Sequence, residues 1–136
     1  MFVCLGNACR SPMAESIARY DAADVMEVFS AGLTPLGFLP SLTTETLEKN
    51  GYSAQNLKSK GITAEAWDKA DIVINMSGTQ RERAFPHYEK VEDWMVEDPY
   101  GEDSRVYQRI FESIQRRVAQ LAEALRQKRQ ATQSEE

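Results

Sequence analysis

The sequence has few of the residues that form disulfide scaffolds, metal sites and membrane spans. Only two cysteines and one histidine occur among its 136 residues. The cysteines are separated by four residues, and a bridge between them closes too small a loop to staple a fold. Apolar runs extend over only a few residues, which excludes a membrane-spanning helix, and no secretory leader is recognisable. We therefore expect a cytoplasmic protein that does not bind membranes.

Positive charge is scarce as well. The chain has 16 lysines and arginines against 21 aspartates and glutamates, a formal net charge of −5. Nucleic acids and anionic membrane surfaces repel an acidic protein, so we expect no nucleic-acid partner. Hydrophobic residues make up 42% and charged residues 27%, which is the balance of an ordinary globular domain. We predict one domain over residues 1–127 and a frayed tail over residues 128–136, where the apolar pattern ends.

Short apolar runs rich in Val, Ile and Phe alternate with amphipathic segments along the chain. The runs that we predict to be strands are Phe2–Leu5, Val25–Ser30, Asp71–Met76 and Glu89–Trp94. Strands that alternate with helices form parallel sheets through right-handed crossovers. The predicted fold class is therefore α/β, a small doubly wound parallel four-stranded sheet with helices on both faces.

Helix signals follow several of these runs. Ser11 and Pro12 are predicted to form the N-cap and first turn of one helix, and Ser77 with Gln80 has capping-box spacing. The other predicted helices are 40–50, 63–70 and a last one, whose apolar stripe runs from Tyr107 to Leu125 opposite Arg105, Arg116 and Arg117.

Residues 4–11, CLGNACRS, lie where the first strand passes into the first helix. In open α/β sheets, ligands bind beyond the carboxyl ends of the strands. Gly6 and Asn7 can adopt the positive φ that turns successive N–H groups inward, and such N–H groups before a helix N-terminus bind anions. The candidate anion-binding residues of this loop are Leu5, Gly6, Asn7, Ala8, Cys9 and Ser11.

The loop also carries a thiol and a guanidinium. Five residues separate Cys4 from Arg10, which places the sulfur at the bottom of the ring of N–H groups and the arginine at its rim. Arg10 can then grip two phosphate oxygens, and the same positive field favours the nucleophilic thiolate of Cys4. The alternatives are a small buried cysteine and a plain surface cation, but the loop and the following helix favour the anion site.

The stretch VCLGNACRSPMAE, residues 3–15, closely resembles the P-loop of the low-molecular-weight protein tyrosine phosphatases. Residues 30–32, Ser-Ala-Gly, resemble the exit of that family's second strand, and residues 98–100, Asp-Pro-Tyr, resemble its general-acid loop. The resemblance covers essentially the whole chain. It implies a phosphomonoester hydrolase, foremost a protein tyrosine phosphatase, that acts on a phosphotyrosine protein or a small aryl phosphate through a phosphocysteine and needs no cofactor or metal.

The resemblance also implies roles for single residues. Cys4 would attack phosphorus while Arg10 and the loop N–H groups stabilise the charged oxygens. Asp98 would protonate the leaving phenolate and then act as base on water. Ser11 would hydrogen-bond the sulfur, and Asn7 would hold the shape of the loop.

Several residues keep two interpretations. Asp98 lies in a segment rich in acids, where Asp93 and Asp103 are the alternative general acids, and Asp-Pro-Tyr-Gly is also an ordinary turn sequence. Tyr100 and Phe38 could line the substrate cleft or cover the edge of the core. The only histidine, at position 87, lies in a polar turn, and nothing else supports a Cys-His protease.

Cys9 is either a packing residue or a redox partner of Cys4. The family resemblance favours the second interpretation, in which peroxide oxidises Cys4 to a sulfenic acid and a Cys4–Cys9 disulfide captures it. A thioredoxin-type reductant would then restore the enzyme.

Three other functions remain in view. A protein-arginine phosphatase is similar, but that branch has Thr at the position of Ala8. The thioredoxin-coupled arsenate reductases need further cysteines downstream, and none follows Cys9. A phosphate-binding module without turnover would need Asp98 to lie away from the site or Cys4 to be protonated.

Overall fold

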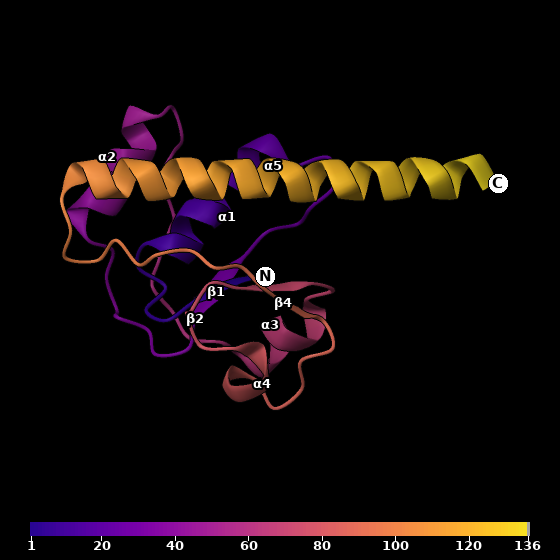
Figure 1. Ribbon diagram of the computed structural model, residues 1–136, viewed down its shortest axis with the longest axis horizontal. Helices are drawn as coiled ribbons and strands as arrows, with labels where there is room; N and C mark the ends of the chain where they lie inside the picture. Colours follow the sequence, from indigo (N-terminus) through magenta and orange to yellow (C-terminus); the bar gives the residue numbers. More distant parts are fainter. Residues whose placement is uncertain (136) are drawn as a thin grey trace.

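The computed structural model describes residues 1–135 as an α/β fold, and the predicted four-stranded parallel sheet is confirmed (Figure 1). The strands are β1 Phe2–Cys4, β2 Ser30–Gly32, β3 Val73–Asn75 and β4 Val91–Asp93, in the spatial order β2-β1-β3-β4. The helices are α1 Arg10–Asp21, α2 Ser41–Lys49, α3 Ala64–Lys69, α4 Arg81–Ala84 and α5 Ser104–Glu135.

Strand β1 lies between β2 and β3, and Cys4 is its last residue. The register pairs Cys4 with Gly32 on β2. A Cβ atom at Gly32 would lie 2.9 Å from the backbone nitrogen of Asn7, closer than real Cβ contacts come. Glycine at position 32 therefore lets the loop after β1 pass directly over the end of β2.

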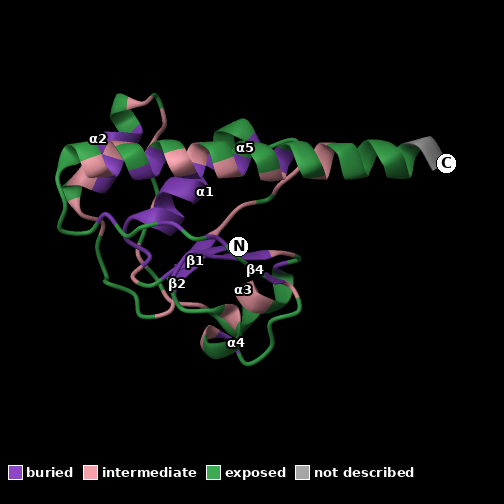
Figure 2. Ribbon diagram, in the orientation of Figure 1, coloured by how far each residue is buried: buried purple, intermediate pink, exposed green. Residues whose placement is uncertain are grey.

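Helices cover both faces of the sheet. On one face α1 packs against β1 and is covered in turn by α5, with Met13, Ile17, Phe111 and Ile114 fully or almost fully buried between them. Figure 2 shows that α1 is buried along most of its length, because it lies between the sheet and α5. The other face is covered by α3 and α4, where the rings of Trp67 and Phe85 stack with their centroids 5.6 Å apart.

The predicted strand over residues 25–30 is wrong for all but its last residue. β2 begins at Ser30, and the register pairs Ser30 with Phe2. Residues 25–29 therefore lie beyond the paired part of β1. Their one hydrogen bond with β1 in the described chain is the bond that Phe2 N donates to the Phe29 carbonyl, at 2.9 Å. Hydrophobic β-branched residues here serve to cover the core, as Val25 and Val28 do.

Two predicted caps are also wrong. Cys9 occupies the N-cap position of α1, and Ser11 is the second residue of the helix. The hydroxyl of Ser11 caps no backbone N–H group and lies beside the sulfur of Cys4 instead. Ser77 and Gln80 form no capping box, since Ser77 Oγ instead accepts from Thr79 N at 3.2 Å. Helices over 40–50 and 63–70 are confirmed within a residue at each end.

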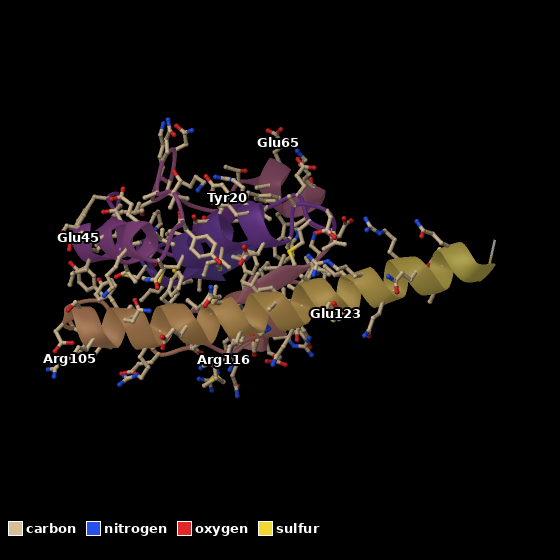
Figure 3. The ribbon with its side chains drawn as sticks, turned by 90° about the horizontal axis from the view of Figure 1, so that it is seen from above. Tyr20, Glu45, Glu65, Arg105, Arg116 and Glu123 are labelled. Carbon is tan, nitrogen blue, oxygen red and sulfur yellow. The ribbon has the colours of Figure 1, made fainter. Side chains whose placement is uncertain are left out.

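The last predicted helix is confirmed and is longer than its apolar stripe. Figure 3 shows Arg105 and Arg116 on the side of α5 that faces away from α1 and α2. Fraying of the tail stays a prediction, but the backbone is helical through Glu135, and side chains 128–133 are exposed; residue 136 lies outside the described residues. Within residues 1–135, no helix combines the length and the apolar character needed to cross a bilayer.

Candidate active site

Residues 4–11, called the P-loop below, curl around the carboxyl end of β1 and lead directly into α1 (Figure 1). Asn7 takes the left-handed conformation, with φ of 47°, which asparagine tolerates better than most residues. Gly6, the other predicted candidate, does not adopt a positive φ. A left-handed residue shortly before a helix N-terminus is the backbone arrangement in which successive N–H groups can turn toward a common point, as they do in anion-binding loops.

The sulfur of Cys4 is buried and has a hydroxyl beside it. Ser11 Oγ lies 3.0 Å from Cys4 Sγ. Asn7 Nδ2 donates to the same hydroxyl oxygen at 2.7 Å, so Ser11 retains its own proton for the sulfur, which is closer than the Ala31 carbonyl at 3.5 Å. A hydroxyl that donates to sulfur stabilises its anionic form.

A chain of buried polar groups holds Asn7 in place. Asn7 Nδ2 also donates to Ser30 Oγ at 3.0 Å, and Ser30 in turn donates to Glu15 Oε1 at 2.6 Å. Asn7 Oδ1 accepts from the backbone nitrogen of Lys60 at 2.9 Å. The buried Glu15 carboxylate is balanced by Arg19 at 2.7 Å and by the Lys60 ammonium at 3.9 Å. The side chain of Asn7 is thus fixed from both ends, which agrees with its predicted role in shaping the loop.

Arg10 is buried and only partly paired. Its Nη1 donates to the Val96 carbonyl at 3.1 Å, and its Nη2 lies 3.5 Å from Asp98 Oδ2. Its Nε is buried without a hydrogen-bond partner in the described chain. A buried charged donor without an acceptor is costly, and an oxyanion bound in the P-loop would supply that acceptor. The side chain of Asp98 is 47% exposed.

A cavity of about 260 Å³ opens above the sulfur. Its lining consists of Cys4, Leu5, Gly6, Ala8, Cys9, Arg10, Thr34, Leu36, Asp98 and Tyr100. Of the residues predicted to contact substrate, Tyr100 therefore lies at the cavity. Within residues 1–135, Phe38 is not part of the lining and is 54% exposed; Leu36 forms the wall on that side. Asn7 and Ser11 belong to the P-loop but are not among the lining residues, and their side chains bond each other and Cys4 beneath the cavity.

The family model described as low molecular weight phosphotyrosine protein phosphatase matches residues 1–131. The chain belongs to this family. Among curated proteins, it is 31% identical to arsenate reductase 1 of Bacillus cereus, over 90% of this chain and 92% of that protein. It is 27% identical to a probable low molecular weight protein-tyrosine-phosphatase, EpsP, of Ralstonia nicotianae, over 87% of this chain and 89% of that protein.

Solved structures of family members superpose closely on this chain. The low molecular weight protein tyrosine phosphatase of T. tengcongensis matches with a TM-score of 0.82 and 30% identity, covering 90% of this chain and 96% of that one. The YwlE arginine phosphatase of Geobacillus stearothermophilus matches with a TM-score of 0.86 and 25% identity, covering 96% and 94%. Family membership and the P-loop together identify the protein as a cysteine-dependent phosphatase.

Asp93 and Asp103, the alternative general acids, are both hydrogen-bonded to groups outside the cavity. Asp93 accepts from Asn75 Nδ2 at 2.8 Å and from the backbone of Arg81 at 3.2 Å. Asp103 accepts from the first backbone N–H groups of α5, which hold the pKa of its carboxyl below the ordinary value. Asp98 alone among the three lines the cavity.

Cys9 belongs to the P-loop, but its thiol lies in a different environment from that of Cys4. Its Sγ is 3.3 Å from the hydroxyl of Tyr107 on α5, and both are buried. Burial raises the pKa of the Cys9 thiol, although the Tyr107 and Thr43 hydroxyls oppose the shift. Cys9 is therefore an uncharged thiol at neutral pH, and it lines the same cavity as Cys4. The structure contains both cysteines as free thiols.

The residues that sequence reasoning missed all act on the P-loop from distant segments. Thr43 on α2 donates to the Ala8 carbonyl at 2.8 Å, and Tyr107, Glu15 and Lys60 contact the loop or its supports as described. Ser59 donates to the Gly6 carbonyl at 2.8 Å. Glu15 falls within residues 3–15, the stretch that resembles the family's P-loop. The other four belong to no recognisable motif, because they are close to the loop in space and far from it in sequence.

Proposed function

We propose that the protein is a phosphomonoester hydrolase, foremost a protein tyrosine phosphatase, that acts through a phosphocysteine on Cys4. One observation carries the proposal. The Cys4 sulfur, with the Ser11 hydroxyl 3.0 Å away, lies in one cavity with a buried arginine that has an unpartnered Nε and with the carboxyl of Asp98. Nucleophile, anion clamp and proton donor are therefore within reach of one phosphate.

In the first step, the Cys4 thiolate attacks phosphorus and the bond between phosphorus and the leaving oxygen breaks. Arg10 and the P-loop N–H groups stabilise the charge on the three remaining oxygens. Asp98 gives its proton to the leaving phenolate. Arg10 lies 3.5 Å from Asp98 in the structure, so the same guanidinium positions both the phosphoryl group and the acid.

In the second step, Asp98 takes a proton from water as the water oxygen attacks phosphorus. The bond between phosphorus and sulfur breaks, and the Ser11 hydroxyl stabilises the Cys4 thiolate that leaves. Inorganic phosphate is released and the enzyme returns to its starting state. The charge stabilisation in both steps comes from Arg10 and the loop.

An aryl phosphate fits the cavity best. Its walls include Leu5, Leu36, Tyr100 and the methyl group of Ala8, which suit a flat apolar ring better than a guanidinium. A phosphotyrosine protein or a small aryl phosphate is therefore the expected substrate. The likeness to the YwlE arginine phosphatase favours phosphoarginine as the second candidate. Specificity constants for phosphotyrosine and phosphoarginine peptides decide between them, and a preference for phosphoarginine would overturn our choice.

We also propose that Cys9 protects the nucleophile from oxidation. Peroxide oxidises Cys4 to a sulfenic acid, and the Cys9 thiol then attacks that sulfur, forming a disulfide and releasing water. A thioredoxin-type dithiol reduces the disulfide. The shared cavity of the two cysteines supports this role, and the alternative is that Cys9 only packs the loop.

Hydrolysis of p-nitrophenyl phosphate, measured in the presence of a chelator and with vanadate as inhibitor, tests the main proposal. Wild type should turn over, and Cys4→Ser should not, because the serine hydroxyl is far less acidic than the thiol. The variant should still bind inorganic phosphate by calorimetry, since Arg10 and the loop remain. Phosphate binding by wild type without turnover would support a silent binding module instead.

A further inference from the structure

Ser59 joins the P-loop to the loop that forms one wall of the cavity. Its hydroxyl donates to the Gly6 carbonyl at 2.8 Å and accepts from the backbone nitrogen of Gly37 at 2.9 Å. Gly6 belongs to the P-loop, and Gly37 follows Leu36, which lines the cavity. The catalytic steps described above do not use Ser59.

The backbone next to Ser59 is hydrogen-bonded to Asn7 in the P-loop and to the end of β2. Its neighbour Lys60 donates from its backbone nitrogen to Asn7 Oδ1 at 2.9 Å. The Lys60 carbonyl accepts from Gly32 N at 2.8 Å, and Gly32 is the last residue of β2. Ser59 is thus fixed relative to the P-loop, so its hydroxyl can hold a second, less constrained segment at a set distance.

The wall loop, residues 34–40, is that less constrained segment. Its first half is tied to the P-loop by Thr34 N to the Leu5 carbonyl at 2.8 Å and by Leu36 N to the Gly6 carbonyl at 2.9 Å. Residues 37–39 make a single hydrogen bond to the rest of the described chain, the bond from Gly37 N to Ser59 Oγ. Gly37 has φ of +91° and open space around it, so nothing else fixes the loop at its turn.

We propose that Ser59 is a specificity-determining positioning residue. The backbone of Leu36 bonds the P-loop itself, and Ser59 fixes the turn directly after it at Gly37, so that this wall of the cavity keeps the shape that fits an aryl leaving group. This inference rests on the proposed phosphatase function. Loss of the hydroxyl leaves the Gly6 carbonyl with its bond from Leu36 N, and Asn7, Ser11 and Arg10 keep their partners. The phosphoryl site therefore stays intact, while the wall beside the ring loosens.

Two competitive inhibitors separate these effects. Inorganic phosphate touches only the P-loop, whereas benzylphosphonate also places a ring against the wall. In Ser59→Ala, we expect the inhibition constant for benzylphosphonate to rise by about fivefold, the ratio typical of one lost hydrogen bond, and that for phosphate to stay unchanged. Ser59→Thr keeps the hydroxyl and should restore the wild-type ratio.

Ser53→Ala is the matched control, because the Ser53 hydroxyl accepts only from Gln55 N, at 3.0 Å, on the same connection between α2 and α3. It should change neither constant. Equal changes of both constants in Ser59→Ala would show that Ser59 only supports the P-loop, and no change would show that it positions nothing; either result overturns the inference. Failure of wild type to hydrolyse p-nitrophenyl phosphate would instead overturn the proposed function itself.

Discussion

At the scale of single residues, Asp98 is the group whose proposed role, as general acid, depends most on the leaving group of the substrate. A general acid contributes about 10²- to 10⁴-fold where the leaving oxygen needs a proton and much less where it does not. Asp98→Asn should therefore slow the hydrolysis of phenyl phosphate far more than that of p-nitrophenyl phosphate. The slope of log kcat/KM against leaving-group pKa measures this, and it should become steeper in the variant.

Asp93→Asn is the control for Asp98→Asn. The carboxylate of Asp93 bonds Asn75 and Arg81 and does not line the cavity, so we expect it to leave the slope unchanged. An equal loss of rate for both substrates in Asp98→Asn would move the role of general acid to another carboxyl group.

Cys9 allows a second prediction at this scale. Cys9→Ser should hydrolyse substrate at nearly the wild-type rate, yet regain much less activity when peroxide treatment is followed by dithiothreitol. Because burial raises the pKa of the Cys9 thiol, more of it becomes thiolate as pH rises, and disulfide formation in wild type should quicken from pH 7 to pH 9. Equal recovery in both proteins would leave Cys9 as a packing residue.

The sequence could predict those site residues that lie close together along the chain, and not those that come together only in the fold. Cys4, Ser11 and Arg10 stand within one loop and one helix turn, so their spacing alone indicates an anion site. Ser30 and Tyr107 support the same loop from 23 and 98 residues away from Asn7 and Cys9. Ser30 belongs to the Ser-Ala-Gly stretch that resembles the family's second-strand exit. Nothing in the sequence, however, pairs its side chain with Asn7 or that of Tyr107 with Cys9, and only the folded chain brings them together.

At the scale of secondary-structure elements, α5 stabilises the fold by covering α1. Ile114 is fully buried at this interface, and its apolar neighbours recur at helical spacing, which is why the sequence predicted this helix. Ile114→Ala should lower the free energy of unfolding by about 2–5 kcal/mol, since it leaves a cavity in the core. Urea unfolding measures the loss, and Gln120→Ala, on the exposed side of α5, should cause little change.

The far part of α5 bonds the end of α1 and the connection that follows it, where Arg126 donates to the Asp21 carbonyl at 2.9 Å and to the side chain of Asp24. Asp24 accepts from Arg126 Nε at 2.8 Å and Nη2 at 2.9 Å, and these bonds lower the pKa of Asp24 from 3.8 to about 2. Asp24→Asn should therefore increase amide exchange in residues 124–133 while the catalytic rate stays the same.

The pH dependence of this contact has a definite sign. A lowered pKa means that the contribution of Asp24 is fully present above pH 3.8 and is lost as pH falls through about 2. Glu27→Gln serves as control, because Glu27 pairs with Lys69 at 3.0 Å and not with α5. Unchanged amide exchange of α5 in Asp24→Asn would show that this contact does not stabilise the end of the helix.

Residues 25–29 show why one element was mispredicted. Val, Met and Phe in this stretch have strand propensity, but a strand also needs a neighbour at the right register. The pairing of Ser30 with Phe2 leaves these residues beyond the ladder. Propensity is local, whereas register is decided by the whole sheet.

At the scale of the whole molecule, the alternation of strands and helices was sufficient to predict the layers, because parallel strands with crossover helices have few arrangements. The order β2-β1-β3-β4 was not predicted, and it is this order that places Cys4 on an inner strand. Figure 1 shows the resulting shape, with α5 lying along the body and extending past it.

The position of β1 in the sheet also determines when the enzyme becomes reactive during synthesis. Cys4 leaves the ribosome long before its neighbours, since β3 begins at Val73 and the helix that covers α1 begins at Ser104. Translation adds about 5–20 residues per second, so for several seconds the nascent chain contains Cys4 before β3, β4 and α5 have been made. On the proposed mechanism, the nascent chain therefore passes through a stage in which Cys4 is present while the site around it is still incomplete.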